Sequence, residues 1–156
     1  MTENVKETRM YHRHMLDELF GEGFIDGELI PRLVATTENS EEEAKVKLDN
    51  CLAYLVARGC QSDPNGSLVC NLGPDEAWHV FILYTDEYTR FCHEYWGVYL
   101  HHDPAGEAAL VNSEADTNRT VRLFEACGIA YDPELWQDYR KYPKGAGVLP
   151  TAVFRL

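Results

Sequence analysis

The sequence has little positive charge, no long hydrophobic run and no paired-cysteine pattern. Lys and Arg together number 14 against 26 Asp and Glu, which gives a net charge of −12. This balance excludes sequence-independent nucleic-acid binding, which needs basic side chains to displace counterions, and it disfavours docking on an anionic membrane surface. No stretch approaches the ~18 consecutive apolar residues of a membrane span. We therefore expect neither a nucleic-acid partner nor a membrane partner.

The cysteines do not fit a secreted disulfide scaffold. There are five, at positions 51, 60, 70, 92 and 127, and their spacing contains no CxxC pair. Cys60 and Cys70 are therefore a weak candidate for a zinc pair. The first residues are polar and carry no secretion signal. These features predict a reducing cytoplasmic location, with thiols free or bound to metal.

The length and periodicity predict a mostly α, single compact multi-helix domain with about six helices. The domain covers residues 1–156, with an ordered core over about 4–140 and an irregular C-terminal tail over 141–156. Three glycines after the first helix predict a loop, at Gly21, Gly23 and Gly27. Helices are expected at 4–20, near Pro31, at 40–58, from Pro74, at 85–97, at 114–127 and after Asp132.

The helix over 40–58 has the clearest pattern. Ser40 is a good N-cap and Glu43 completes a capping box, while Gly59 is a stop signal. A buried stripe is expected at Ala44, Leu48, Cys51, Leu52 and Leu55. On similar grounds Cys127 is expected in the core, and His12 and His14 are expected on the surface.

A histidine-rich segment in the middle of the chain contains the candidate functional residues. Four of the six histidines lie between positions 79 and 102. His79 lies on a helix that is apolar nearly all round, and Asp75 lies one turn earlier on the same face. A buried imidazole needs partners for its nitrogens. Further ligand-type side chains follow at Cys92, His101 and His102.

These residue types together predict a metal site. His79, Cys92 and one of the adjacent pair His101 and His102 are the expected ligands, with Asp75 as a further ligand or as the group that orients an imidazole. Imidazole, thiolate and carboxylate suit zinc best, with iron or copper as alternatives. The structural alternative is a hydrogen-bonded core histidine at 79 and a histidine pair that caps a helix C-terminus.

The same segment resembles the glycine-rich domain-containing protein-like family. The shared pattern is an Asp-x-x-Trp-His core followed by Tyr, Cys, Gly and a terminal His-His, and here it consists of Asp75, Trp78, His79, Ile82, Leu83, Tyr88, Cys92, Gly97, His101, His102 and Pro104. Many eukaryotic members carry a second histidine where this chain has Phe81. The resemblance implies a small helical domain with a genuine His/Cys/Asp site. The glycine-rich tail and RNA-binding-like region of plant members are missing, so their RNA association is not implied.

Three functions fit these features. The first is a metal-dependent enzyme acting on a small molecule or peptide. The second is a non-catalytic adaptor whose acidic surface binds a basic protein or peptide. The third is nucleophilic catalysis by Cys92, with His79 or His101 as the base.

Overall fold

A computed structural model describes residues 12–102 and 114–136 of the chain. Within these residues every regular element is a helix and no strand occurs, so the predicted mostly α, multi-helix fold is confirmed. The expected tail over 141–156 and the expected start of the first helix at 4–11 lie outside the described residues.

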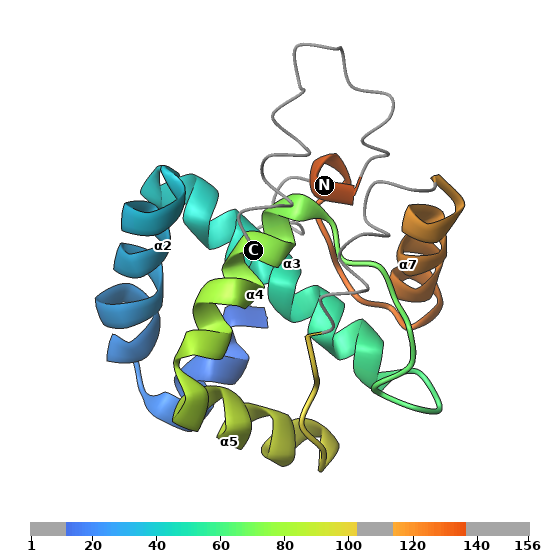
Figure 1. Ribbon diagram of the computed structural model, residues 1–156, viewed down its shortest axis with the longest axis horizontal. Helices are drawn as coiled ribbons and strands as arrows, with labels where there is room; N and C mark the ends of the chain where they lie inside the picture. Colours follow the sequence, from blue (N-terminus) through green and yellow to red (C-terminus); the bar gives the residue numbers. More distant parts are fainter. Residues whose placement is uncertain (1–11, 103–113, 137–156) are drawn as a thin grey trace.

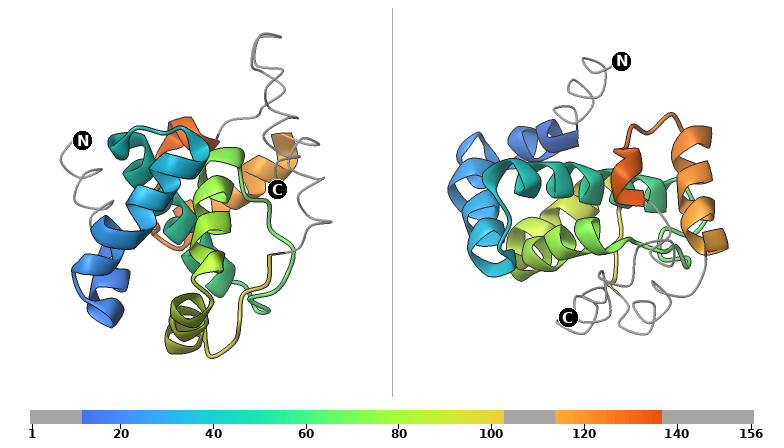
Figure 2. Two further views of the ribbon diagram at one scale, coloured as in Figure 1. Left: turned by 60° about the vertical axis from the view of Figure 1, so that its left-hand side comes forward. Right: turned by 90° about the horizontal axis from the view of Figure 1, so that it is seen from above.

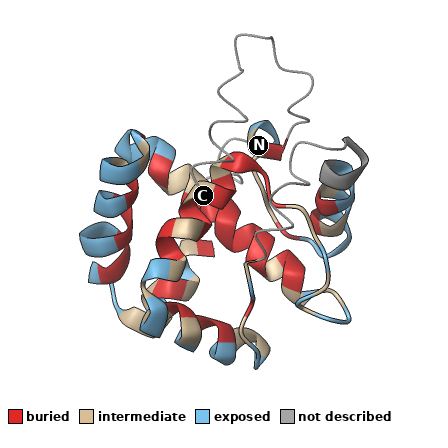
Figure 3. Ribbon diagram, viewed as in Figure 1, coloured by how far each residue is buried: buried red, intermediate tan, exposed pale blue. Residues whose placement is uncertain are grey.

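Helix α3 (Glu41–Gly59) is the centre of the fold. Its capping box forms as predicted: the Glu43 amide donates to Ser40 Oγ at 3.1 Å, and the Ser40 amide donates to Glu43 Oε1 at 3.0 Å. All five residues of the predicted stripe are buried. Figure 3 shows that burial continues along most of the helix. Helix α3 therefore forms the support on which the other helices pack.

The other helices surround α3. Helix α4 (Leu72–Leu83) packs along it, and α5 (Thr85–Trp96) follows α4 directly (Figure 1). Helices α2 (Ile30–Thr37) and α7 (Glu114–Ala126) also contact α3 and lie toward its opposite ends, as Figure 2 shows from above. A short 3₁₀ helix, η3 (Pro133–Trp136), returns the chain to α4.

The loop predicted at Gly21, Gly23 and Gly27 is confined to residues 21–22, where Gly21 has φ +82°. The chain is helical from residue 23 onward, through the π-helix η1 (Ile25–Leu29) and directly into α2. Phe24, Ile25 and Leu29 are buried in the core. Their burial outweighs the helix penalty of glycine at position 27, which is of the order of 1 kcal/mol.

Two expectations about burial are wrong. His12 is buried, and its Nε2 lies 2.9 Å from the Ala130 carbonyl oxygen, while Cys127 is exposed just after the end of α7. His14 is exposed as expected and pairs with Glu18. His12 is buried because the segment at Ala130, which is distant in the sequence, covers it.

The C-terminal ends of α3 and α5 approach closely. A Cβ atom on Gly59 would lie 1.8 Å from Trp96 Nε1. Gly59 is thus required by the close approach of the Trp96 ring, although the sequence indicated only a helix stop. Gly97 follows with φ +69°, a left-handed conformation suited to glycine that ends α5.

None of the helices in the described ranges is long and apolar enough to cross a membrane.

Candidate metal centre

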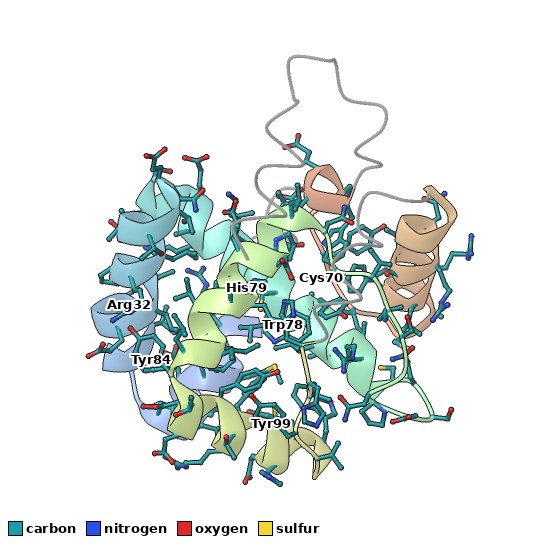
Figure 4. The ribbon with its side chains drawn as sticks, viewed as in Figure 1. Arg32, Cys70, Trp78, His79, Tyr84 and Tyr99 are labelled. Carbon is teal, nitrogen blue, oxygen red and sulfur yellow. The ribbon has the colours of Figure 1, made fainter. Side chains whose placement is uncertain are left out.

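The candidate site joins one turn of α4 to the segment that follows α5. Asp75 lies in the first turn of α4, and His79 lies one turn later on the same face. His102 comes from the irregular segment after Gly97. Asp75, His79 and His102 each offer one ligand atom, and these atoms all lie within 4.8 Å of one another. Figure 4 labels His79 beside Trp78 on α4.

The carboxyl group of Asp75 lies between the two imidazoles. Its Oδ1 is 2.8 Å from His102 Nε2, and its Oδ2 is 3.3 Å from His79 Nδ1. His79 Nδ1 also lies 2.7 Å from the Asp75 backbone carbonyl oxygen, to which it donates. That hydrogen bond leaves the lone pair of a neutral His79 ring on Nε2.

Burial makes the ionised form of Asp75 costly. The residue is 1% exposed, and its Oδ2 accepts no hydrogen bond from the described residues. Desolvation raises the pKa of Asp75 to about 7; the charge of Glu76 adds to this effect, while His79 opposes it. A bound cation would stabilise the carboxylate and satisfy the second oxygen.

The three side chains of the site differ in their exposure to solvent. The His79 side chain is 29% exposed, whereas those of His102 and Asp75 are 10% and 2% exposed. Solvent or a small ligand would therefore reach the site on the His79 side, with Asp75 at its inner end.

A hydrogen-bonded chain of buried groups positions His102. Trp78 Nε1 donates to the Tyr88 hydroxyl at 3.0 Å, and that hydroxyl donates to the Leu100 carbonyl at 2.6 Å. The Leu100 amide donates to Cys92 Sγ at 3.4 Å. The Trp78 ring also contacts the His102 ring, with centroids 4.1 Å apart. Leu100 is thus fixed by both of its backbone polar groups, two residues before His102.

A second clamp holds the same segment from the loop after α3. Asn65 Oδ1 accepts from the His101 amide at 2.9 Å, and Asn65 Nδ2 donates to the Tyr99 carbonyl at 2.9 Å. Buried Arg58 donates to the His101 carbonyl at 3.2 Å and to Asn65 Oδ1 at 2.8 Å. Sequence reasoning missed Arg58 and Asn65, because nothing in the sequence pairs the 61–67 turn with residues 99–101.

Two of the predicted ligands lie outside this group of three. Cys92 is buried and bonds the Leu100 amide, and burial raises the pKa of its thiol. Such a thiol stays protonated at neutral pH, which makes it a poor nucleophile and a poor thiolate ligand. The ring of His101 is exposed and packs against Tyr99, with centroids 4.9 Å apart.

Comparison with known proteins identifies the family. The family model described as UCP032817-like matches residues 44–129, which is more than half of the chain. The chain belongs to the UCP032817-like family. The matched residues include α4, α5 and all three residues of the candidate metal centre. Neither the curated proteins nor the solved structures yielded a match.

Membership of the UCP032817-like family overturns the resemblance to glycine-rich domain-containing proteins. Much of the pattern on which that resemblance rested has packing roles here. Trp78 and Tyr88 are buried in the core, and Gly97 ends α5. Helical packing can require such residues at such spacings in more than one family. The name of the UCP032817-like family states no activity or ligand, so the function must be inferred from the site.

Proposed function

We propose that this UCP032817-like protein binds a divalent transition metal through Asp75, His79 and His102. The observation that carries the proposal is a buried carboxyl group between two imidazoles, with ligand atoms within 4.8 Å of one another. The Oδ2 atom, which accepts no hydrogen bond from the described residues, supports the same conclusion.

Two histidines and one carboxylate favour zinc first and iron second. Catalytic zinc sites use three protein ligands of these types and keep one position for water or substrate. A set of two histidines and one carboxylate is also the pattern of non-haem Fe(II) sites. Copper is less favoured, because the thiol of Cys92 lies outside the group.

We infer that the site acts on a small molecule or peptide that approaches past His79. A metal there would supply a Lewis acid and an activated water. The chain's own groups would orient the site: Asp75 would hold His102, and the Asp75 carbonyl would hold the tautomer of His79. We expect this chemistry to operate in the cytoplasm, a location that the free thiols of all five cysteines support.

The acidic-adaptor function is the weaker proposal. Its strongest motif is the exposed run Glu41–Glu43. Two of these carboxylates already have local roles, because Glu43 closes the capping box and Glu41 pairs with Lys45. All three also complement the positive end of α3. Because these local roles already explain the acidic run, the run gives less support to the binding of a basic partner.

The test compares two adjacent histidines. The wild type, His102→Ala and His101→Ala are purified without tag or chelator and analysed for bound metal, then titrated with Co(II) while visible absorption is recorded. We expect one equivalent of metal in the wild type and in His101→Ala, and a large loss in His102→Ala. Equal binding by all three proteins, or no stoichiometric metal in the wild type, would refute the proposal.

A further inference from the structure

The turn that follows α3 contains the only Asn-Gly pair of the sequence, at Asn65 and Gly66. Asn65 is an exposed residue, but its side-chain amide is bonded to the segment that leads to His102. Its Oδ1 accepts from the His101 amide at 2.9 Å and from Arg58 Nη2 at 2.8 Å. Its Nδ2 donates to the Tyr99 carbonyl at 2.9 Å. One side-chain amide thus holds two residues of that segment.

An asparagine that precedes a glycine is chemically labile. The Gly66 nitrogen can attack Asn65 Cγ, because glycine has no side chain to hinder the approach. A bond forms between these two atoms, the bond from Cγ to Nδ2 breaks, and Nδ2 leaves as ammonia with the proton that the Gly66 nitrogen loses. The succinimide ring that results takes up one water and opens to aspartate or to isoaspartate.

The folded turn opposes this attack at both reacting groups. The Gly66 amide donates to the Asp63 carbonyl at 2.8 Å, and the Asn65 amide donates to Asp63 Oδ1 at 3.0 Å. For the ring to close, the Gly66 amide must give up its hydrogen bond and the Asn65 side chain must leave its three partners. We therefore expect the reaction to pass through a locally opened form of the turn.

We propose that Asn65 is a deamidation site whose reaction rate is set by opening of the clamp that Asn65 and Arg58 form on residues 99–101. The reaction also prevents the clamp from closing again. An ionised aspartate has no hydrogen to donate to the Tyr99 carbonyl, so an oxygen would face an oxygen there. Isoaspartate also lengthens the backbone of the turn by one carbon atom.

The consequence for metal binding rests on the proposed function. The clamp holds the His101 amide and carbonyl, and the next residue is the candidate ligand His102. Deamidation would loosen the backbone that places this ligand and would weaken metal binding. The deamidation itself does not depend on a metal.

The test incubates the full-length protein in chelator at mildly alkaline pH, both folded and unfolded in urea, and follows position 65 by peptide mapping. We expect deamidation at this position in urea, and a rate about 10- to 100-fold lower in the folded wild type, because the clamp must open first. Arg58→Lys loses the planar fork of donors and should react faster than the folded wild type. Arg119→Lys is the matched control: it alters a contact to Ser67 in the same turn and should keep the wild-type rate.

A second measurement needs no substitution. Hydrogen exchange of the His101 amide in the wild type reports opening of the clamp, and in increasing sub-denaturing urea it should rise in parallel with the deamidation rate. Equal deamidation rates in the folded and unfolded wild type, or a rate that does not follow this exchange, would overturn control by the clamp.

The last step compares the two forms of the wild type after separation by ion exchange. The deamidated form should bind Co(II) about 10-fold more weakly than the intact form. Equal affinity would overturn the effect on the metal centre. A wild type that binds no metal would instead refute the proposed function, while the deamidation rates would still test the clamp.

Discussion

Replacing Asp75 by asparagine is expected to stabilise the metal-free protein at neutral and alkaline pH. Burial raises the pKa of Asp75 from 3.8 to about 7. A folded-state pKa above the unfolded value means that the group contributes stability below pH 3.8 and loses that contribution as the pH rises through about 7. Asparagine has nearly the same shape and stays neutral, so it avoids the loss.

The size of the effect follows from the pKa shift. Each unit is worth ~1.4 kcal/mol, so ionised Asp75 costs the metal-free fold up to roughly 4 kcal/mol. Its carboxyl group is only 2% exposed, and solvent therefore screens little of this cost. We expect Asp75→Asn to raise the free energy of unfolding by about 2 to 4 kcal/mol at about pH 8.5, and to change it little near pH 4.

The assay is urea unfolding of both proteins in chelator across this pH range, repeated with excess zinc. Zinc at a hundredfold its dissociation constant should add about 2.7 kcal/mol to the wild type and much less to the variant, which has lost an anionic ligand. A variant less stable than the wild type in chelator at about pH 8.5 would refute the electrostatic reasoning. Equal stabilisation of both proteins by zinc would refute Asp75 as a ligand.

Three other changes test the support of the site and the packing of the fold. Tyr88→Phe leaves the Leu100 carbonyl and Trp78 Nε1 without their shared partner; it should cost about 1 to 3 kcal/mol in urea unfolding and weaken Co(II) binding by about 10- to 100-fold in titration. Gly59→Ala should lower the stability by about 1 to 3 kcal/mol because its Cβ would meet the Trp96 ring, and thermal melts should show a smaller loss in a Trp96→Ala background. Burial lowers the pKa of His12, so its contribution is present above pH 6.5 and lost as the pH falls below that value; the melting temperature of the wild type should therefore fall relative to that of His12→Asn over this range.

Local sequence signals predicted the central helix well. The capping box at Ser40 and the apolar stripe of α3 depend on residues within a few positions of one another, and both formed as expected. The burial of His12 and the exposure of Cys127 depend instead on which distant segment covers a helix end. Periodicity carries no information about that segment.

The same reasoning could predict only part of the candidate metal centre. Asp75 and His79 are one helical turn apart, so their shared face could be read from spacing. The choice between His101 and His102 depends on how residues 98–102 run after Gly97. That path is set by Asn65 and by the Tyr88 hydroxyl, through hydrogen bonds that span long stretches of sequence. No periodic pattern encodes such bonds.

The structural alternative for the histidines explains part of what is found at Asp75. A hydrogen-bonded core histidine would account for the bond from His79 to the Asp75 carbonyl and for the contact between His102 and Oδ1. It accounts less well for Oδ2, which lies 3.3 Å from His79 Nδ1 but is buried and accepts no hydrogen bond from the described residues. It also leaves unexplained a carboxyl group whose ionisation burial opposes. Asparagine could make the contact with His102 without a buried charge. A cation held by Asp75, His79 and His102 would both satisfy Oδ2 and favour the ionised form of the carboxyl group. The metal-binding proposal therefore explains more of the structure than the alternative.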